Sequence, residues 1–355
     1  MYSASQLIGK MSKGYEKKCI ELGIIKRKRE FKTPADLMLL CLFHLINGCS
    51  LMEVSTAAKE LHIGEFSDVA FMKKFAKCGE WFRQINTELC ECSVADYQKP
   101  SYLENYRVLA TDASDITSTG SKTQKYRLHY AIDIFKMSCV QNKITAQSQG
   151  ETLKNFAFAK GDLVIADRIY GTVNGIAHCI EKGADFILRL RTNCFAFYDE
   201  NHNKIDIVSA VVELKSEECA DIFGFVKDSN AKTFIPVRIC VKRKSETAIV
   251  QSRKKLRLRA TNKQHQLQPK TEIFNDYIFV VTSLSRDISS VDILETYRYR
   301  WQIEMYFKRL KSILGIGDMP KKNETSSLAW LDGKIMVSLL IDAVLSEISF
   351  FPSSE

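Results

Sequence analysis

The sequence predicts an α/β protein in which a mixed β-sheet carries helices on its faces. Residues 1–100 contain few glycines and place apolar side chains at helical spacing, which predicts a helical N-terminal domain. Residues 101–191 change to three successive strands and then to alternating strands and helices, a pattern typical of a mixed sheet covered by helices. Residues 192–284 interrupt this order with runs of alternating polarity, so we expect a mostly β insertion. Residues 285–350 are then predicted to return to the sheet domain.

Within the helical domain, residues 50–76 have the outline of a helix-turn-helix. Apolar spacing predicts a first helix over Leu51–Leu61, Gly64 interrupts it, and Ser67 is placed to cap a second helix that runs to Phe75. Any small helical bundle can give the same pattern. This domain is therefore expected to contact DNA either through a groove-reading helix-turn-helix or in another geometry.

The sheet domain and the insertion are predicted from runs of apolar or alternating residues bounded by turn signals. In the sheet domain the predicted strands are Tyr106–Thr111, Tyr126–Phe135, Met137–Thr145, Asp162–Ala166 and Asp185–Leu190, and the predicted helices are Glu151–Ala159, Asn174–Lys182 and the apolar Ser326–Ile348. In the insertion the alternating runs are Ile205–Leu214, Phe223–Val226, Phe234–Lys242 and Tyr277–Val281.

The charge of the chain favours a polyanionic partner. Lys and Arg number 51 against 42 Asp and Glu, which gives a net charge of +9. The excess is uneven: from Arg238 to Lys270 there are eleven basic residues and one acidic residue, Glu246. A second basic run covers Lys26–Arg29. The stretch Lys242–Lys270 is predicted to be either a phosphate-binding basic arm on the insertion or a solvated helix surface.

Composition also excludes several classes of protein. The eleven cysteines form no CxxC pair and show no regular spacing, so neither a disulfide framework nor a zinc site is expected. The N-terminus has no apolar signal segment. The longest apolar run, Ile335–Leu345, is interrupted by Asp342 and is too short to span a bilayer. We therefore expect a soluble cytoplasmic protein with reduced thiols and no membrane partner.

The stretch Tyr297–Lys311 reads as one amphipathic helix with an unusual polar face. At about 100° per residue, Tyr297, Arg300, Glu304 and Lys311 fall within about 60° of one another. An apolar stripe for the core lies beside them and comprises Ile303, Phe307, Leu310 and Leu314. A carboxylate, two cations and a phenol on one face can handle a metal ion and phosphate oxygens. The alternative is a solvated helix face with an ordinary Arg300–Glu304 pair.

Two further carboxylates stand where predicted strands stop. Asp112 follows Tyr106–Thr111 and Asp167 follows Asp162–Ala166, and catalytic groups gather at strand ends in α/β sheets. Asp115 is the competitor of Asp112, and either aspartate could instead cap a turn. With Glu304 they make three hard oxygen ligands. Such a set suits Mg²⁺ or Mn²⁺, and two such ions support in-line phosphoryl transfer.

The order of these residues resembles the DDE transposases of bacterial insertion sequences, most closely the insertion-sequence-4 family. The resemblance is carried by DAS at Asp112–Ser114, ADRIY at Ala166–Tyr170, and the Tyr-x2-Arg-x3-Glu-x6-Lys pattern within Tyr297–Lys311. It implies a ribonuclease H-like catalytic core with a β insertion before the Glu-bearing helix. It also implies cut-and-paste transposition of double-stranded DNA, in which a homodimer pairs the terminal inverted repeats and joins them to target DNA on the bacterial nucleoid.

The same resemblance implies roles for individual residues. Two Mg²⁺ or Mn²⁺ ions would be held by the catalytic residues Asp112, Asp167 and Glu304. DNA phosphate near the scissile bond would be bound by Tyr297, Arg300, Lys311 and Arg168. The freed 3′-hydroxyl is expected to form a hairpin, with a flipped base stacked on an aromatic residue near Tyr277. Independently of the resemblance, Trp301 faces away from these side chains and is expected to pack in the core. His129, on a predicted strand, is expected to pack in the core or beside the metal ligands and not to be a ligand itself.

The chain ends soon after its apolar helix, so the C-terminal segment that supports dimer contacts in many relatives is expected to be absent. Three functions therefore remain open. The first is an active metal-dependent transposase. The second is a catalytically decayed DNA-binding remnant that occupies element ends without cutting. The third is a stand-alone nuclease on the same core.

Overall fold

The computed structural model describes residues 4–26, 31–90, 96–118, 120, 124–191, 195–264, 266–320 and 323–346. Most of the predicted basic run Lys26–Arg29 lies outside these residues. The chain forms two compact units. The first unit comprises Met1–Gln98, Ala113–Gln149 and Met305–Glu355, and the second unit comprises Lys99–Asp112 and Gly150–Glu304. None of the described helices combines the length and apolarity needed to cross a bilayer.

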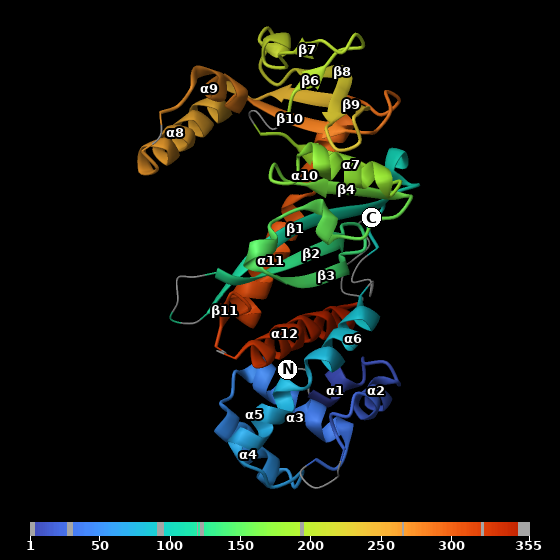
Figure 1. Ribbon diagram of the computed structural model, residues 1–355, viewed down its shortest axis with the longest axis vertical. Coiled ribbons are helices and arrows are strands. Elements are labelled where there is room, and N and C mark those ends of the chain that lie inside the picture. Colours follow the sequence, from blue (N-terminus) through green and yellow to red (C-terminus); the bar gives the residue numbers. More distant parts are fainter. Residues whose placement is uncertain are drawn as a thin grey trace, which may run out of the picture. The chain divides into compact units, whose positions relative to one another are not determined.

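The first unit contains a helical bundle, as the apolar spacing of residues 1–100 predicts (Figure 1). Its central helix is α12, which packs against α3, α5 and α6 and is buried on nearly all sides. Ser67 caps α5 by accepting a hydrogen bond from the amide of Ala70 at 3.2 Å, which confirms that predicted helix start. The bundle helices are α1 (Ala4–Ile8), α2 (Tyr15–Glu21), α3 (Pro34–Asn47), α4 (Leu51–Glu60), α5 (Asp68–Ala76), α6 (Gly79–Leu89) and α12 (Glu324–Leu345).

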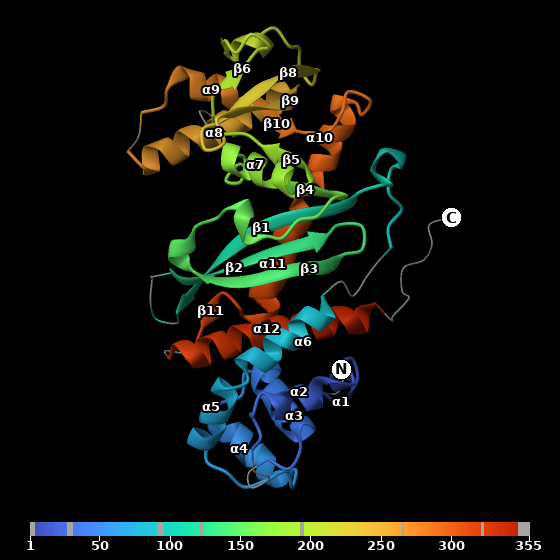
Figure 2. The ribbon, with the colours of Figure 1, turned by 45° about the vertical axis from the view of Figure 1, so that its right-hand side comes forward.

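The first unit also holds a small sheet. Strand β2 (Gln124–Asp133) pairs with β3 (Ser138–Ala146) and neighbours β1 (Arg107–Ser118), on which β11 (Asp318–Met319) pairs in parallel. Helix α11 (Trp301–Leu314) lies against these strands (Figure 2). Its Tyr306 stacks on Tyr130 of β2 with ring centroids 4.9 Å apart.

The second unit is built on a mixed sheet, which confirms the predicted α/β class. Its strand order is β1-β4-β5-β10-β9-β8-β6-β7. The first half of β1, β4 and β5 run parallel, and the remaining pairs are antiparallel. These strands are β4 (Asp162–Ala166), β5 (Asp185–Arg189), β6 (Phe197–Tyr198), β7 (Lys204–Ile205), β8 (Cys219–Asp228), β9 (Thr233–Arg243) and β10 (Tyr277–Thr282).

The helices of the second unit begin with α7 (Val173–Glu181), which confirms the helix predicted over Asn174–Lys182. The basic stretch forms α8 (Glu246–Asn262) and α9 (Pro269–Asn275), a helical hairpin that projects from the ends of β9 and β10 (Figure 1). Helix α10 (Ser290–Arg298) packs on β8 and β9.

Two predicted elements are wrong. Only a short 3-10 turn, Leu153–Asn155, forms within the expected helix Glu151–Ala159, because Phe156 and Phe158 both turn inward in extended chain. The expected strand Ile205–Leu214 ends after Ile205, because the Asp206 side chain accepts a hydrogen bond from the amide of Val208 and starts a turn.

Candidate active site

Asp112 and Asp167 are neighbours in the sheet of the second unit. Strands β1 and β4 run parallel with Thr111 opposite Ala166, so the next residues on each strand are Asp112 and Asp167. Neighbouring strands lie about 4.8 Å apart, and residues at one register point to the same face. The backbone therefore places Asp112 and Asp167 next to each other where the β1–β4 pairing ends. Asp167 is further fixed because its Oδ1 accepts a hydrogen bond from the amide of Ile169 at 2.8 Å.

The expectation that Asp112 ends its strand is wrong. Strand β1 continues to Ser118, because β2 pairs along it after β4 has stopped at Ala166. Asp112 thus stands where the pairing with β4 ends, in mid-strand. Its predicted competitor Asp115 is three residues on and so points to the opposite face. There Asp115 accepts a hydrogen bond from Nε of Arg127 at 2.9 Å.

The predicted single helix over Tyr297–Lys311 is also wrong. Helix α10 ends at Arg298 and α11 begins at Trp301. The junction is a tight turn in which the amides of Tyr299 and Arg300 bond to carbonyls three residues back, at 3.1 Å each. Near the break, the hydroxyl of Thr296 donates to the carbonyl of Asp292 at 2.7 Å, a bond that bends helices. The apolar stripe itself is confirmed, since Ile303, Phe307 and Leu310 are buried.

Glu304 is held by Arg300 across this junction. Nη2 of Arg300 donates to Oε1 of Glu304 at 2.5 Å. Although burial opposes it, the charges of Tyr297, Glu304 and Asp112 raise the pKa of Arg300. Arg300 therefore contacts Glu304 directly and is influenced by the charge of Asp112. In the described part of the chain, no group of three or more His, Cys, Asp or Glu side chains is gathered to hold a metal ion.

Tyr297 is buried next to Arg300. Burial raises the pKa of its phenol, the charge of Asp167 acts in the same direction, and Arg300 and Arg189 oppose it. Among the described residues, neither the hydroxyl of Tyr297 nor Nε of Arg300 has a hydrogen-bond partner. Buried polar atoms are rarely left unsatisfied in proteins, so these two donors are suited to an anionic ligand.

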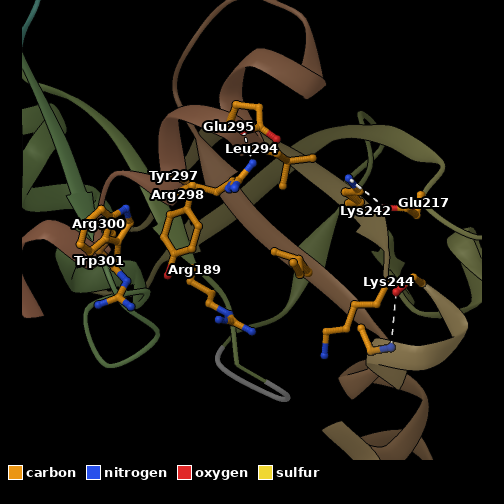
Figure 3. A pocket seen from close by; sticks show the side chains of 13 residues that line it. Arg189, Glu217, Lys242, Lys244, Leu294, Glu295, Tyr297, Arg298, Arg300 and Trp301 are labelled. Carbon is orange, nitrogen blue, oxygen red and sulfur yellow. Dashed lines mark hydrogen bonds and ion pairs between the residues drawn. The ribbon is translucent and has the colours of Figure 1, made fainter. Parts of the chain in front are cut away.

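A cavity of about 480 Å³ adjoins these residues (Figure 3). Cationic side chains from β5, β9 and the α10–α11 junction meet around it, and its apolar wall includes Leu294 and Ile278. The expectation that Trp301 packs in the core is wrong, because its side chain is 54% exposed and lines this cavity. Tyr277, expected near a flipped base, is buried and packs against Phe279 instead.

Arg189 and Lys244 line the same cavity and were not singled out from the sequence. Arg189 is the last residue of β5. Its position at the carboxyl end of a parallel strand could have marked it as a candidate site residue. Lys244 follows β9 and carried no such signal. Burial, together with the charges of Arg189 and Arg168, lowers the pKa of Lys244 to about 8 against the opposing charge of Asp276.

Arg168, in the loop after β4, lies close to Arg189 and Lys244, and these three residues are called the basic cluster below. The loop packs tightly on β5: a Cβ at Gly171 would lie 2.2 Å from the carbonyl oxygen of Arg189, so only glycine fits there. Desolvation lowers the pKa of Arg168, and the charges of Arg189 and Arg259 act in the same direction. Arg168 is itself exposed to solvent.

The remaining predicted residues lie apart from this cluster or differ from expectation. Lys311 is exposed on α11, two turns after Glu304 and within the first unit. His129 is fully buried on β2, and its Nε2 lies 2.9 Å from the hydroxyl of Thr145, which confirms core packing.

About half of the basic residues in the stretch Lys242–Lys270 form ion pairs, mostly with acidic residues outside it, such as Arg253 with Asp276.

The arrangement combines two adjacent carboxylates with a surrounding set of cations. Carboxylate oxygens are the ligands that Mg²⁺ and Mn²⁺ prefer, and Arg and Lys bind phosphate oxygens. Asp112 and Asp167 therefore have the chemistry of two ligands of a divalent metal ion. Such a surface can position a phosphodiester next to a metal site.

Comparison with known proteins agrees with this chemistry. Residues 104–340 match the family described as "Transposase DDE domain". The chain is 26% identical over 336 residues to the putative transposase InsL for insertion sequence element IS186A of Escherichia coli K12, covering 93% of this chain and 90% of that protein.

Two more relatives extend the comparison. The transposase for insertion sequence element IS421 of Escherichia coli is 26% identical over 337 residues, which cover 93% of this chain and 90% of the relative. The transposase for insertion sequence element IS1151 of Clostridium perfringens is 26% identical over 236 residues, or 60% of this chain and 47% of the relative. The chain is therefore a DDE transposase of the kind encoded by bacterial insertion sequences.

Proposed function

We propose that this transposase excises and inserts its element by cut-and-paste phosphoryl transfer at the candidate active site. The observation that carries the proposal is the register of β1 with β4, which sets Asp112 beside Asp167. DDE transposases depend on divalent metal ions, and Asp112, Asp167 and Glu304 are the carboxylates that would hold two Mg²⁺ or Mn²⁺ ions here. Bound there, the ions supply Lewis acidity for activating a water or a 3′-hydroxyl and for stabilising the leaving oxygen.

The protein side chains bind and orient the DNA. Arg300, Tyr297 and Arg168 surround the carboxylates and would hold phosphate oxygens near the scissile bond, and Lys311 would add a contact further along α11. Arg189 and Lys244 extend this set. Glu304 would bind a metal ion either through the carboxylate oxygen that Arg300 leaves free or after a DNA phosphate has replaced it on that guanidinium.

The same proposal includes a hairpin intermediate formed when the freed 3′-hydroxyl attacks the opposite strand. A base at the element end must then leave the stack. Trp301 replaces Tyr277 as the aromatic on which that base would stack, because the Trp301 ring is exposed on the cavity wall.

Wider assignments complete the proposal. We propose a ribonuclease H-like core over residues 101–191 and 285–350, a DNA-binding and assembly domain over residues 1–100, and an insertion over residues 192–284. The Tyr-x2-Arg-x3-Glu-x6-Lys pattern supports placement in the insertion-sequence-4 family. Its DNA partners would be the terminal inverted repeats and the target duplex. It would act as a homodimer on the cytoplasmic nucleoid.

The test is strand cleavage of a labelled duplex that carries the element's own terminal repeats, with Mg²⁺ or Mn²⁺ present or withheld. Wild type should nick at the repeat end only with metal. Glu304→Gln should bind the duplex and cut at least about 10³-fold more slowly, since a metal ligand contributes several kcal/mol. Glu181→Gln, on the exposed face of α7, is the matched control and should cut normally.

The other outcomes separate the rival functions. Wild type that binds the repeat ends without cutting in either metal would identify a DNA-binding remnant. Metal-dependent cutting without end specificity or joining would identify a nuclease. Cutting that survives Glu304→Gln would place the active site elsewhere.

A further inference from the structure

The α8–α9 hairpin, from Glu246 to Asn275 and called the arm below, carries two kinds of basic residue. The first kind is committed to the fold. Arg253 binds both carboxylate oxygens of Asp276, and Arg257 binds both oxygens of Glu272 at 2.9 and 3.3 Å. Ser252 accepts a further hydrogen bond from Asn275 at 3.0 Å. These contacts hold α8 to α9 and to the start of β10.

The side chains of the second kind are exposed and make no ion pair or hydrogen bond among the described residues. They are those of Lys254, Lys255, Arg259 and Lys263. Paired donors are already satisfied, whereas these four cations remain available to an external anion. The arm therefore contains arginines that stabilise its fold and other cations that are exposed to solvent.

The exposed cations do not all point the same way. At about 100° per residue, Lys255 and Arg259 share one stripe of α8 with Ala248 and Ser252, within about 60°. Lys254 lies about 130° from the centre of that stripe. The stripe extends about 16 Å from Ala248 to Arg259.

The Ala248 end of the stripe is located relative to the candidate active site. Ala248 lines the same cavity as Arg189 and Lys244. Because Lys255 and Arg259 share the helix face of Ala248, the stripe leads from this cavity outward along α8, within the second unit.

We propose that Lys255 and Arg259 bind phosphates of the DNA backbone where the duplex leads away from the candidate active site; this pair is called the rail below. Arg253 and Arg257 only stabilise the fold of the arm. This inference rests on the proposed function, since it takes the bound polymer to be the DNA that the site cuts. Lys255 and Arg259 are about 6 Å apart along α8, more than the 3.4 Å rise per nucleotide of one DNA strand, so the two cations can reach separate phosphates.

The experiment measures binding of the full-length protein to a labelled duplex with the element's terminal repeat, by fluorescence anisotropy in EDTA over a range of salt concentrations. Lys255→Ala with Arg259→Ala should weaken binding at least 10-fold. It should also lower the slope of log affinity against log salt by about 2, because each phosphate contact contributes about 0.9. Lys254→Ala, the same substitution on the other side of α8, should leave both values unchanged.

Two controls keep the result interpretable. The double variant should melt at the wild-type temperature, since its two side chains have no partner to lose among the described residues. Arg257→Ala should lower the melting temperature instead, because it breaks the pair with Glu272. Stepwise shortening of the duplex beyond the cleavage site should reach a length at which the double variant and wild type bind equally.

The outcomes separate this inference from the proposed function. Equal affinity and salt slope for the double variant, with normal metal-dependent cutting by wild type, would overturn the rail and leave the function standing. If Lys254→Ala lowered DNA affinity and the salt slope as much as the double variant does, this would also overturn the rail. It would show that binding depends on the total charge of α8 and not on one side of it. Failure of wild type itself to bind or cut would instead refute the proposed function.

Discussion

Arg300, in the turn between α10 and α11, forms an ion pair of 2.5 Å with Glu304 in the first turn of α11. The Arg300 side chain is only 16% exposed, whereas that of Glu304 is 56% exposed. The guanidinium is thus held in place by its surroundings, and the carboxylate is the partner that can move. An incoming phosphate would compete with Glu304 for Arg300. DNA binding would in this way free Glu304 to complete a metal site with Asp112 and Asp167.

Arg300→Ala should weaken binding of the terminal-repeat duplex about 10- to 100-fold, since a hydrogen bond to a charged group contributes about 1.5–3 kcal/mol. Anisotropy in EDTA measures this without cleavage. Arg286→Ala removes an arginine that stacks on Phe223 and lines a different cavity, and it should bind like wild type. Equal binding by Arg300→Ala would show that Arg300 serves only to hold Glu304.

Asp112→Asn and Asp115→Asn should have opposite effects, because the two side chains point to opposite faces of β1. Asp112→Asn should abolish metal-dependent cutting and keep the wild-type melting temperature. Asp115→Asn should keep cutting and reduce the free energy of unfolding by about 1–2 kcal/mol, because it weakens the pair with the buried Arg127. Cleavage assays and thermal melts on both variants decide the assignment, and the reverse result would make Asp115 the catalytic residue.

Trp301→Ala should slow hairpin formation more than the first nick, since base stacking on an aromatic contributes about 1–3 kcal/mol. The rate of hairpin formation should fall about 10-fold or more. A fluorescent base analogue at the element end should also show a smaller change in emission on binding. Tyr277→Phe is the comparison, because that ring is buried and keeps its packing. An unchanged hairpin rate in Trp301→Ala would exclude this stacking role.

DNA affinity should fall as pH rises from 7 to 9, because Lys244 has a pKa of about 8. Its charged form predominates below that pH and is the form that binds phosphate, so deprotonation at higher pH removes one contact. Ordinary lysines titrate near 10.4 and stay charged over this range. Lys244→Ala should bind more weakly at pH 7 and show little change up to pH 9, whereas Lys254→Ala should retain the pH dependence.

Stability should fall as pH drops from about 6.5 towards 4, because burial and the charges of Arg127 and Lys143 lower the pKa of His129 to about 4. In this range the imidazole of His129 is protonated in the unfolded chain and neutral in the folded chain. The free energy of unfolding therefore decreases by up to about 1.4 kcal/mol for each pH unit of acidification. Denaturant unfolding at several pH values measures the slope. His129→Gln should reduce it, and an unchanged slope would assign the acid sensitivity to other groups.

Local pattern was sufficient for much of the fold. Strand β4 over Asp162–Ala166 and the core stripe of Ile303, Phe307 and Leu310 follow from neighbouring residues alone, because burial repeats with the period of the strand or helix. The order of Asp112, Asp167 and Glu304 was likewise readable from the chain. The helix predicted through Tyr299 failed because the amides of Tyr299 and Arg300 bond to carbonyls three residues back, which forms a turn between two helices.

The sequence by itself pointed to Asp112, Asp167 and Glu304 as candidate residues and to most of the strands and helices, since both depend on side-chain type and short-range spacing. Tertiary structure decided which of them meet. It placed Asp112 beside Asp167 through strand register, brought Arg189 and Lys244 to the same cavity, and neutralised Arg253 with Asp276, which lies 23 residues away. Such contacts depend on long-range packing, and no local period encodes them.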